Sequence, residues 1–345
     1  MPEIIIRKEG RAGRITLNRP KALNALTEDM LRSIDQALSD WADDDEVALV
    51  LIDATGDRAF AAGGDIVDLY NTGRDGDFAF GQRFWAYEYQ LNARIAAYHK
   101  PYVAIMHGFT MGGGVGVSAL GSHRIVTDGS LIAMPECGIG LVPDVGGSKL
   151  LADAPGHCGK YLSATSARMD AADAIYAGFA DVYVPDYKLV ELKTALAETG
   201  DVAVIDRFAA TATGGTLADV QVQIDAAFGA DTAARAEAAL ASDGSDWAVA
   251  TLKAMRRNCP LSVACAHPMI DAAHAMTLPE ALAQEYRFTA RCMEFGEFLE
   301  GIRAAVIDKD RNPQWAKPTL SDVTDADIAA MLAPLPGGDL TFLTE

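Results

Sequence analysis

Apolar residues follow two different periods in the first half of the chain, and together they predict strands separated by helices. Residues 14–17 form a short alternating run, 47–52 a continuous apolar run, and 102–106 another. Continuous apolar runs of this length are typical of strands buried on both faces. Between the first two runs, apolar residues recur at helical spacing from Met30 to Trp41. This alternation indicates a parallel α/β core.

The helix expected after residue 27 has a clear start signal. Thr27 can cap the first turn with its hydroxyl group. The acidic residues Glu28 and Asp29 follow in that turn, where the helix dipole favours negative charge.

The second half of the chain differs in composition and in apolar spacing. From about residue 186, Ala-rich segments with helical spacing dominate, most clearly over 278–302. We therefore predict a core over residues 1–185 and a helical region over residues 186–345, in line with a prior of one domain per ~150 residues.

Charge narrows the function classes. The chain has 345 residues, 50% of them hydrophobic, and its 29 basic against 48 acidic residues give a formal net charge of −19. This balance argues against a nucleic-acid binder and against attachment to anionic lipid, because both need basic surface. It leaves room for an anionic small ligand, since a few local donors can hold one phosphate.

Targeting and metal-binding signals are missing from the sequence. No run of about 18 apolar residues occurs, so we expect no transmembrane helix and no membrane partner. The first seven residues contain only three consecutive apolar residues before a charge, far fewer than the core of a signal peptide. The five cysteines are scattered and no CxxC, HxxH or HExxH motif occurs, so we expect neither disulfides nor a metal site. We expect a soluble cytoplasmic protein.

Two glycine-rich segments, 60–66 and 107–116, each follow an apolar strand-like run. Glycine is selected where backbone must approach a ligand closely or take a positive φ. Free N–H groups in such turns can point at an anion or a developing oxyanion. The alternative is a pair of tight turns with small residues for close packing.

The second segment also contains Gly114-x-Gly116-x-x-Ala119, which imitates a dinucleotide fingerprint, with Asp128 further on. The spacing argues against this interpretation. Gly121-Ser122 breaks the chain soon after Gly116, whereas a dinucleotide fold needs a full crossover helix.

Two acidic residues, Glu136 and Asp144, stand in an apolar stretch rich in Gly and Pro over 134–147. Asp144 follows a proline and precedes Val-Gly-Gly, so it is also a candidate turn-capping residue. Glu136 has apolar flanks and less use as a cap. Desolvation of such a carboxyl raises its pKa and suits it to proton transfer near neutral pH.

Glu88 falls on one helical stripe with apolar and aromatic residues. It is either a residue at the margin of a core or a carboxylate facing a pocket. Cys137 lacks a histidine close in sequence, so we interpret it as a small core residue rather than a nucleophile.

Several segments together resemble the crotonase (enoyl-CoA hydratase/isomerase) superfamily. They are residues 61–66, 110–114, and Pro135-Glu136 leading to Gly140. Finer features are similar to the 3-hydroxyisobutyryl-CoA hydrolase branch of that superfamily. They are residues 88–92, 100–104, 112–116, 133–147, and 300–315. The resemblance covers about residues 4 to 330.

The resemblance implies a crotonase-like ββα spiral core, with a helical C-terminal region, that binds an acyl-CoA thioester. Coenzyme A is then part of the substrate and no further cofactor is expected. The N–H groups of Gly64 and Gly113 would form the oxyanion hole. Glu136 and Asp144 would be the catalytic carboxylates, and Glu88 would contact the substrate together with Gly113. Fixed backbone donors of this kind stabilise the charge that a thioester oxygen gains on attack.

One departure separates the branches of the superfamily. Hydratases carry a second glutamate two residues past the third glycine, and here that position is Gly116. Thioester hydrolysis is therefore favoured, with enoyl-CoA hydration or isomerisation as the alternative. A non-catalytic acyl-CoA-binding protein is a third hypothesis, against which the Glu136/Asp144 pair argues.

The sequence leaves four matters open. The acyl group is not fixed, and Glu136 can act as a nucleophile or as a general base. Arg19 and Lys21 are candidates for the CoA phosphates, although a solvated loop explains them equally well. The oligomeric state is open as well: trimers and their dimers are common in the superfamily, so the resemblance suggests a trimer-based homo-oligomer, but the altered C-terminal helices could change that.

Overall fold

The computed structural model describes residues 2–342 and divides into two compact units, each assembled from three segments. The first, here called the strand unit, takes the residues up to Gly64 together with Leu91–Ala133 and Arg168–Thr216. The second, here called the helical unit, takes Asp65–Gln90, Met134–Ala167 and the residues from Leu217 on. The units do not follow the boundary predicted at 185/186, because the chain passes between them several times.

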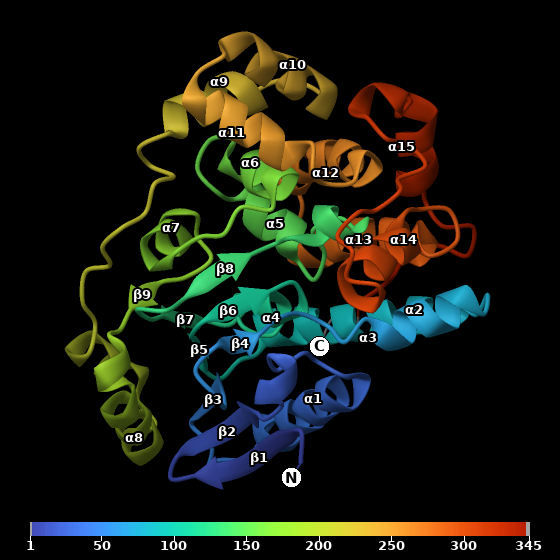
Figure 1. Ribbon diagram of the computed structural model, residues 1–345. Helices are drawn as coiled ribbons and strands as arrows, with labels where there is room; N and C mark the ends of the chain where they lie inside the picture. The colour runs from blue at the N-terminus through green and yellow to red at the C-terminus, as the bar shows by residue number, and fades with distance from the viewer. Residues whose placement is uncertain (1, 343–345) are drawn as a thin grey trace. The chain divides into compact units, whose positions relative to one another are not determined.

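Every strand of the described residues belongs to the strand unit. The strands are β1 (Ile4–Glu9), β2 (Ala12–Leu17), β3 (Leu49–Ala54), β4 (Ala59–Ala61), β5 (Tyr102–Met106), β6 (Phe109–Met111), β7 (His123–Val126), β8 (Leu131–Ala133) and β9 (Val182–Tyr183). They form a six-stranded sheet in the order β1-β2-β3-β5-β7-β9 and a three-stranded sheet in the order β4-β6-β8. Only β1 is antiparallel to its neighbour; the other pairs are parallel (Figure 1).

Successive strands alternate between the two sheets. β3, β5 and β7 lie in the larger sheet, and each is followed within a few residues by β4, β6 or β8 in the smaller one. This strand–strand–helix repetition is the ββα spiral that the family resemblance implies. The carboxyl ends of parallel strands share one edge, so the turns that follow β4 and β6 are neighbours.

Buried apolar residues join the six-stranded sheet to helix α8 (Leu189–Thr199). This core contains Leu49, Leu51, Val103, Ile105, Ile125, Leu192 and Leu196. β3 and β5 are buried along their whole length, as continuous apolar runs require. α8 packs on the sheet although it follows residue 186. The division into compact units therefore differs from the division predicted from the change in amino-acid composition.

The remaining helices of the strand unit are short or amphipathic. They are α1 (Glu28–Ala42), α4 (Gly113–Gly116) and α7 (Ala171–Tyr176), while α3 (Phe78–Ala97) begins in the helical unit and ends in the strand unit. Thr27 caps α1 as predicted, because its hydroxyl accepts the Met30 N–H at 3.3 Å. α4 contains only four residues, so the crossover helix of a dinucleotide site is absent from this segment.

The helical unit contains no strand within the residues described. Its helices are α2 (Val67–Arg74), α5 (Gly147–Ala152), α6 (Cys158–Thr165), α9 (Gln221–Phe228), α10 (Ala233–Asp243), α11 (Asp246–Met255), α12 (Pro260–Ala273), α13 (Leu278–Cys292), α14 (Phe298–Ile302) and α15 (Asp325–Leu332). α5, α6 and α12 pack against one another (Figure 1).

Two predicted elements differ in extent from the observed ones. The strand expected over 47–52 runs instead from Leu49 to Ala54. The helix expected over 278–302 is interrupted after Cys292, and a turn closed by the Phe295 N–H on the Arg291 carbonyl leads to α14. Apolar spacing continues through this turn and therefore hides the break.

No helix within residues 2–342 is long and apolar enough to cross a membrane. All five cysteines are buried, and none of them forms a disulfide. The pKa of the Cys137 thiol is raised by burial, which supports its interpretation as a core residue.

Candidate active site

The two glycine-rich turns lie side by side in the strand unit. β4 and β6 are paired, and a Cβ atom added to Gly63 would lie 3.4 Å from the Met111 carbonyl oxygen and 4.0 Å from the Gly113 nitrogen. Gly63 has φ +108°, a conformation that side chains rarely adopt. α4 also approaches β4 closely, since a Cβ on Gly114 would lie 2.5 Å from the Ala61 carbonyl oxygen.

The amide groups proposed for the oxyanion hole occupy these turns. Leu26 forms a parallel β-bridge with Gly64, in which the Leu26 N–H donates to the Gly63 carbonyl at 2.9 Å. In a parallel bridge of this kind the residues on either side of Gly64 form the hydrogen bonds, so the N–H of Gly64 itself is not used. Gly113 is the first residue of α4, where an N–H has no partner within the helix. Both amides are therefore available to an acceptor atom of a ligand.

Glu136 opens a short helical turn in the helical unit. The turn, Glu136–Ile139, is closed by the Leu141 N–H on the Glu136 carbonyl, and Gly140 ends it with φ +77°. Glu136 is only 5% exposed, and its Oε2 atom is buried without a hydrogen-bond partner. Buried polar atoms are rarely left unpaired, so this oxygen is a candidate contact for a ligand.

Asp144 lies in a tight turn that follows Pro143. The Gly147 N–H closes the turn on the Asp144 carbonyl at 2.7 Å, and both Val145 and Gly146 have positive φ. The capping interpretation of Asp144 is incomplete, because its side chain is buried and accepts a hydrogen bond from the Tyr89 hydroxyl at 2.8 Å. The carboxyl group thus faces the interior of the helical unit.

Glu88 lies on α3 and is 3% exposed. Its Oε1 atom is buried without a hydrogen-bond partner, like the Oε2 atom of Glu136. Of the two interpretations left open by the sequence, an unpaired buried oxygen favours a carboxyl group that awaits a ligand.

The buried acids of the helical unit influence one another. Burial raises the pKa of Glu136 well above its usual value, and Asp144, followed by Glu285 and Glu88, raises it further. Burial raises the pKa of Asp144 to about 7, although the Tyr89 hydroxyl lowers it. Burial and then Asp144 raise the pKa of Glu88. Near neutral pH the cluster therefore carries fewer charges than it has carboxyl groups, and it can take up or release a proton.

Sequence reasoning missed two residues of this cluster, Tyr89 and Glu285. Glu285 is fully buried on α13 and accepts hydrogen bonds from the backbone of Gly146 and Ser148. Its helical spacing from Leu282 and Thr289 could have revealed it, because it places a carboxylate on the apolar face of the predicted helix. Tyr89 lies in the 88–92 segment that resembles the hydrolase branch, but that resemblance gave it no role, and tyrosine is ordinary in a core.

The basic residues proposed for phosphate binding lie near the first 3₁₀ turn of the strand unit, Pro20–Ala22. Arg19 pairs with Glu3 at 2.9 Å and donates to the Ala25 carbonyl, so it already has partners. Lys21 is exposed. The role of both in binding CoA stays a prediction.

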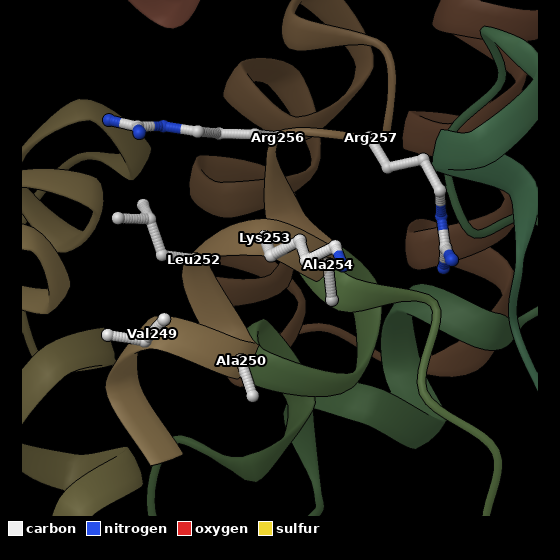
Figure 2. Close-up of a pocket in the computed structure, with 7 residues that line it drawn as sticks. All are labelled: Val249, Ala250, Leu252, Lys253, Ala254, Arg256 and Arg257. Carbon is white, nitrogen blue, oxygen red and sulfur yellow. The ribbon is translucent and has the colours of Figure 1, made fainter. Parts of the chain in front are cut away.

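An apolar cavity of about 670 Å³ lies along α11, and none of the predicted site residues lines it (Figure 2). Two of its cations, Arg256 and Arg257, extend in opposite directions. Arg256 also pairs with Glu237 at 2.6 Å. The cations thus do not converge on one anion. Across residues 2–342, no group of three or more His, Cys, Asp or Glu side chains is placed to hold a metal ion.

A family comparison agrees with these features. Residues 12–332 match the model of a family described as enoyl-CoA hydratase/isomerase. This chain belongs to the enoyl-CoA hydratase/isomerase family. The superfamily predicted from the glycine-rich and Pro-Glu motifs is thereby confirmed.

Relatives and solved structures of the enoyl-CoA hydratase/isomerase family extend over nearly the whole chain. The 3-hydroxyisobutyryl-CoA hydrolase, mitochondrial, of Rattus norvegicus is 39% identical over 99% of this chain and 91% of its own length. The protein of the same name from Xenopus tropicalis is 39% identical over 98% and 90%. These matches support the hydrolase branch predicted from the finer motifs.

Among solved structures of this family, an enoyl-CoA hydratase from Rhodobacter sphaeroides 2.4.1 has a TM-score of 0.95 at 50% identity and covers 99% of this chain and 100% of its own. A carnitinyl-CoA dehydratase from Mycobacterium thermoresistibile has a TM-score of 0.95 at 40% identity, with 99% coverage of both chains. The predicted crotonase-like fold is confirmed.

Proposed function

We propose that the protein hydrolyses the thioester of a short, branched β-hydroxyacyl-CoA, with 3-hydroxyisobutyryl-CoA, an intermediate of valine catabolism, as the substrate. The observation that carries the proposal is Glu136, a buried carboxyl group with one unpaired oxygen next to a second acid that can exchange a proton. The hydrolase names of relatives that match nearly the full chain support the same reaction.

In the proposed reaction, the one proton that Glu136 and Asp144 share near neutral pH first moves to Asp144. The Glu136 carboxylate then either attacks the thioester carbon or removes a proton from the water that does so. The N–H groups of Gly64 and Gly113 stabilise the oxyanion, and losing one such donor typically costs ~10²–10³ in rate. The carbon–sulfur bond then breaks, and Asp144 donates a proton to the CoA thiolate. In the nucleophilic route, water releases the acyl group from Glu136 and returns a proton to Asp144. In the general-base route, the proton that Glu136 took from water passes to Asp144 and restores the pair.

Glu88 is proposed to hydrogen-bond the β-hydroxyl group of the acyl chain. Its unpaired Oε1 atom supports this role, because a substrate hydroxyl would satisfy an otherwise orphaned buried acceptor. A site built to pair with a hydroxyl group discriminates strongly against an analogue that lacks it. Isobutyryl-CoA is therefore expected to be a poorer substrate than 3-hydroxyisobutyryl-CoA.

The first prediction concerns Glu136. The variant Glu136→Gln keeps the size of the side chain but removes its ionisable group, so it is expected to lose at least about 10²-fold in turnover while still binding acyl-CoA. Release of free CoA is measured with a thiol reagent, and binding by isothermal calorimetry. Glu297→Gln, another buried glutamate of the helical unit, serves as the matched control. Near-normal turnover by Glu136→Gln would reject the proposed role.

Hydration of an enoyl-CoA is the second candidate, because the Rhodobacter sphaeroides structure carries the name of a hydratase at 50% identity. α4 ends at Gly116, so this helix supplies no second glutamate for water addition. The wild-type protein incubated with crotonyl-CoA decides between them. Loss of the conjugated absorbance without thiol release would favour hydration, and tight binding of every short acyl-CoA without turnover would favour a non-catalytic protein.

We also propose that the protein is cytoplasmic, needs no metal or cofactor beyond the CoA of its substrate, and assembles as a trimer-based oligomer. The five cysteines, none of which forms a disulfide, support a reducing compartment, whereas the curated relatives are named as mitochondrial proteins. Cell fractionation, activity after dialysis against a chelator, and sedimentation of the 36.6 kDa chain test the three statements separately.

A further inference from the structure

The turn that carries Asp144 is held in place by a residue distant in sequence. Val145 has φ +54°, which is unfavourable for a β-branched residue, and Gly146 follows with φ +83°. Strained turns persist only where the surroundings fix them. The Glu285 carboxyl supplies this restraint, since it accepts the N–H groups of Gly146 and Ser148, each at 2.9 Å.

The same acceptor also binds a side chain, because the Ser148 hydroxyl lies 2.5 Å from the Oε1 atom of Glu285. Glu285 thus satisfies three donors on the residues that directly follow the Asp144–Val145 step. Its hydrogen bonds go to the turn and not to the Asp144 side chain, so it holds that side chain through the backbone and otherwise acts on it by charge alone.

The Asp144 side chain has a separate restraint. The Tyr89 hydroxyl donates to Asp144 Oδ2 at 2.8 Å, and the longer 3.4 Å approach to Thr289 Oγ1 is the weaker competitor for its single proton. The Tyr89 ring is fully buried and meets the Tyr286 ring edge-on, with centroids 6.2 Å apart. The hydroxyl group is therefore held in place before any ligand binds.

We propose that Tyr89 and Glu285 are positioning residues that fix the Asp144 carboxyl group, Tyr89 by its hydrogen bond to Oδ2 and Glu285 by clamping the turn. This inference rests on the proposed function for its kinetic consequences. Neither residue contacts the thioester in the proposed reaction, and neither role follows from the motifs in the sequence.

The pH dependence follows from the groups around Asp144. The groups that interact with it electrostatically are Glu136 from its short turn, Glu88 and Tyr89 from α3, and Glu285 and Cys292 from α13. Among these, Tyr89 alone lowers the pKa of Asp144, because its hydroxyl stabilises the carboxylate. Loss of that hydroxyl therefore raises the pH at which the pair formed by Glu136 and Asp144 gains its single negative charge.

The second prediction tests Tyr89. In Tyr89→Phe, the acidic limb of the kcat profile moves up by about one pH unit, so that turnover falls about five-fold at pH 7 and recovers at pH 9, while KM changes less than two-fold. Tyr286→Phe is the matched control, because its hydroxyl donates to the Gln82 carbonyl and its ring touches that of Tyr89. Its profile stays at the wild-type position.

The second arm replaces Glu285 with Gln. An amide leaves one of the Gly146 or Ser148 N–H groups facing an NH₂ group, so the turn loosens and kcat falls about ten-fold or more with KM nearly constant. Glu297→Gln is the control, since Glu297 also accepts two backbone N–H groups, from Ala316 and Lys317. The melting temperature of Glu297→Gln is expected to fall by about as much as that of Glu285→Gln. The kcat and the pH profile of Glu297→Gln are expected to stay at their wild-type values.

A titration without substrate separates this inference from the proposed function. The ¹³C resonance of the Asp144 carboxyl carbon, assigned with Asp144→Asn, is followed against pH in the wild-type protein and in Tyr89→Phe. A higher pKa of Asp144 in Tyr89→Phe than in the wild-type protein supports the inference. If no acyl-CoA is hydrolysed, that result still stands and the proposed function alone fails. An unchanged titration in Tyr89→Phe, or equal kcat loss in Glu285→Gln and Glu297→Gln, would overturn it.

Discussion

Asp144 shows how far a single residue departs from what its type predicts. An aspartate in a turn normally serves as a solvated cap, whereas this one is 4% exposed with a pKa raised from 3.8 to about 7 by burial. A group whose pKa is higher in the folded than in the unfolded state binds more protons when folded. The folded protein is therefore destabilised as pH rises from about 4 to about 7, and the penalty is complete above that range.

The third prediction follows from this sign. Asp144→Asn removes the penalty while its amide oxygen can still accept the Tyr89 hydrogen bond, so the variant is expected to be more stable than the wild type at pH 8 and equal to it at pH 4. The gain at pH 8 is on the order of 2–4 kcal/mol for a shift of this size. Thermal unfolding at both pH values measures it.

Asp53 supplies the control for this prediction because its environment is opposite. Burial opposes its ionisation, but Lys193 and then Thr16 and Arg14 hold its pKa below the usual value. Its stabilisation is present above about pH 4 and is lost as pH falls below that value. Asp53→Asn should therefore be destabilised at pH 8, and a stability gain there would contradict the sign argument for both residues.

At the scale of elements, signals carried by neighbouring residues predicted the start of α1 and the bounds of β5, whereas contacts between distant residues were not predicted. The capped start of α1 and the bounds of β5 depend on neighbouring residues, and both match the prediction. The break between α13 and α14 was missed because apolar spacing continues across it. The clamp on the Asp144 turn joins residues 139 positions apart, Gly146 and Glu285, and no local pattern encodes such a contact.

The glycines of the second turn could be recognised as special from sequence, but their individual reasons come from packing. Gly112 needs its positive φ of +49°. Gly114 instead needs its missing Cβ, because a carbon there would lie 2.5 Å from the Ala61 carbonyl oxygen and 2.9 Å from the Ala61 Cβ. The residues of both turns are thus tied to the β4–β6 pairing.

The fourth prediction concerns this close approach. Gly114→Ala forces α4 away from β4, so we expect a loss of about 1–3 kcal/mol in unfolding free energy and a larger loss of turnover than of acyl-CoA binding. Gly129→Ala is the control, since a Cβ there meets nothing within 4 Å and no positive φ is required. Urea denaturation and CoA release measure both effects, and an unimpaired Gly114→Ala would show that the turn tolerates displacement.

At the scale of the whole molecule, charge opposes the proposed substrate. The chain carries a formal net charge of −19, and an acyl-CoA brings several negative phosphate charges of its own. Long-range repulsion of like charges slows their encounter, and salt screens it over a Debye length of about 10 Å at 0.1 M. Composition alone predicts this barrier, whereas the local donors that overcome it depend on the fold.

The fifth prediction is that kcat/KM for an acyl-CoA rises about two- to five-fold between 10 and 150 mM NaCl, because screening removes repulsion that acts before the ligand is bound. Salt is expected to raise the association rate and lower KM, while kcat stays constant. The N-acetylcysteamine thioester of the same acyl group lacks the phosphates, so its kcat/KM should not depend on salt. A fall of kcat/KM with salt for the acyl-CoA alone would instead mean that local cations attract the phosphates strongly enough to outweigh the net charge of the molecule.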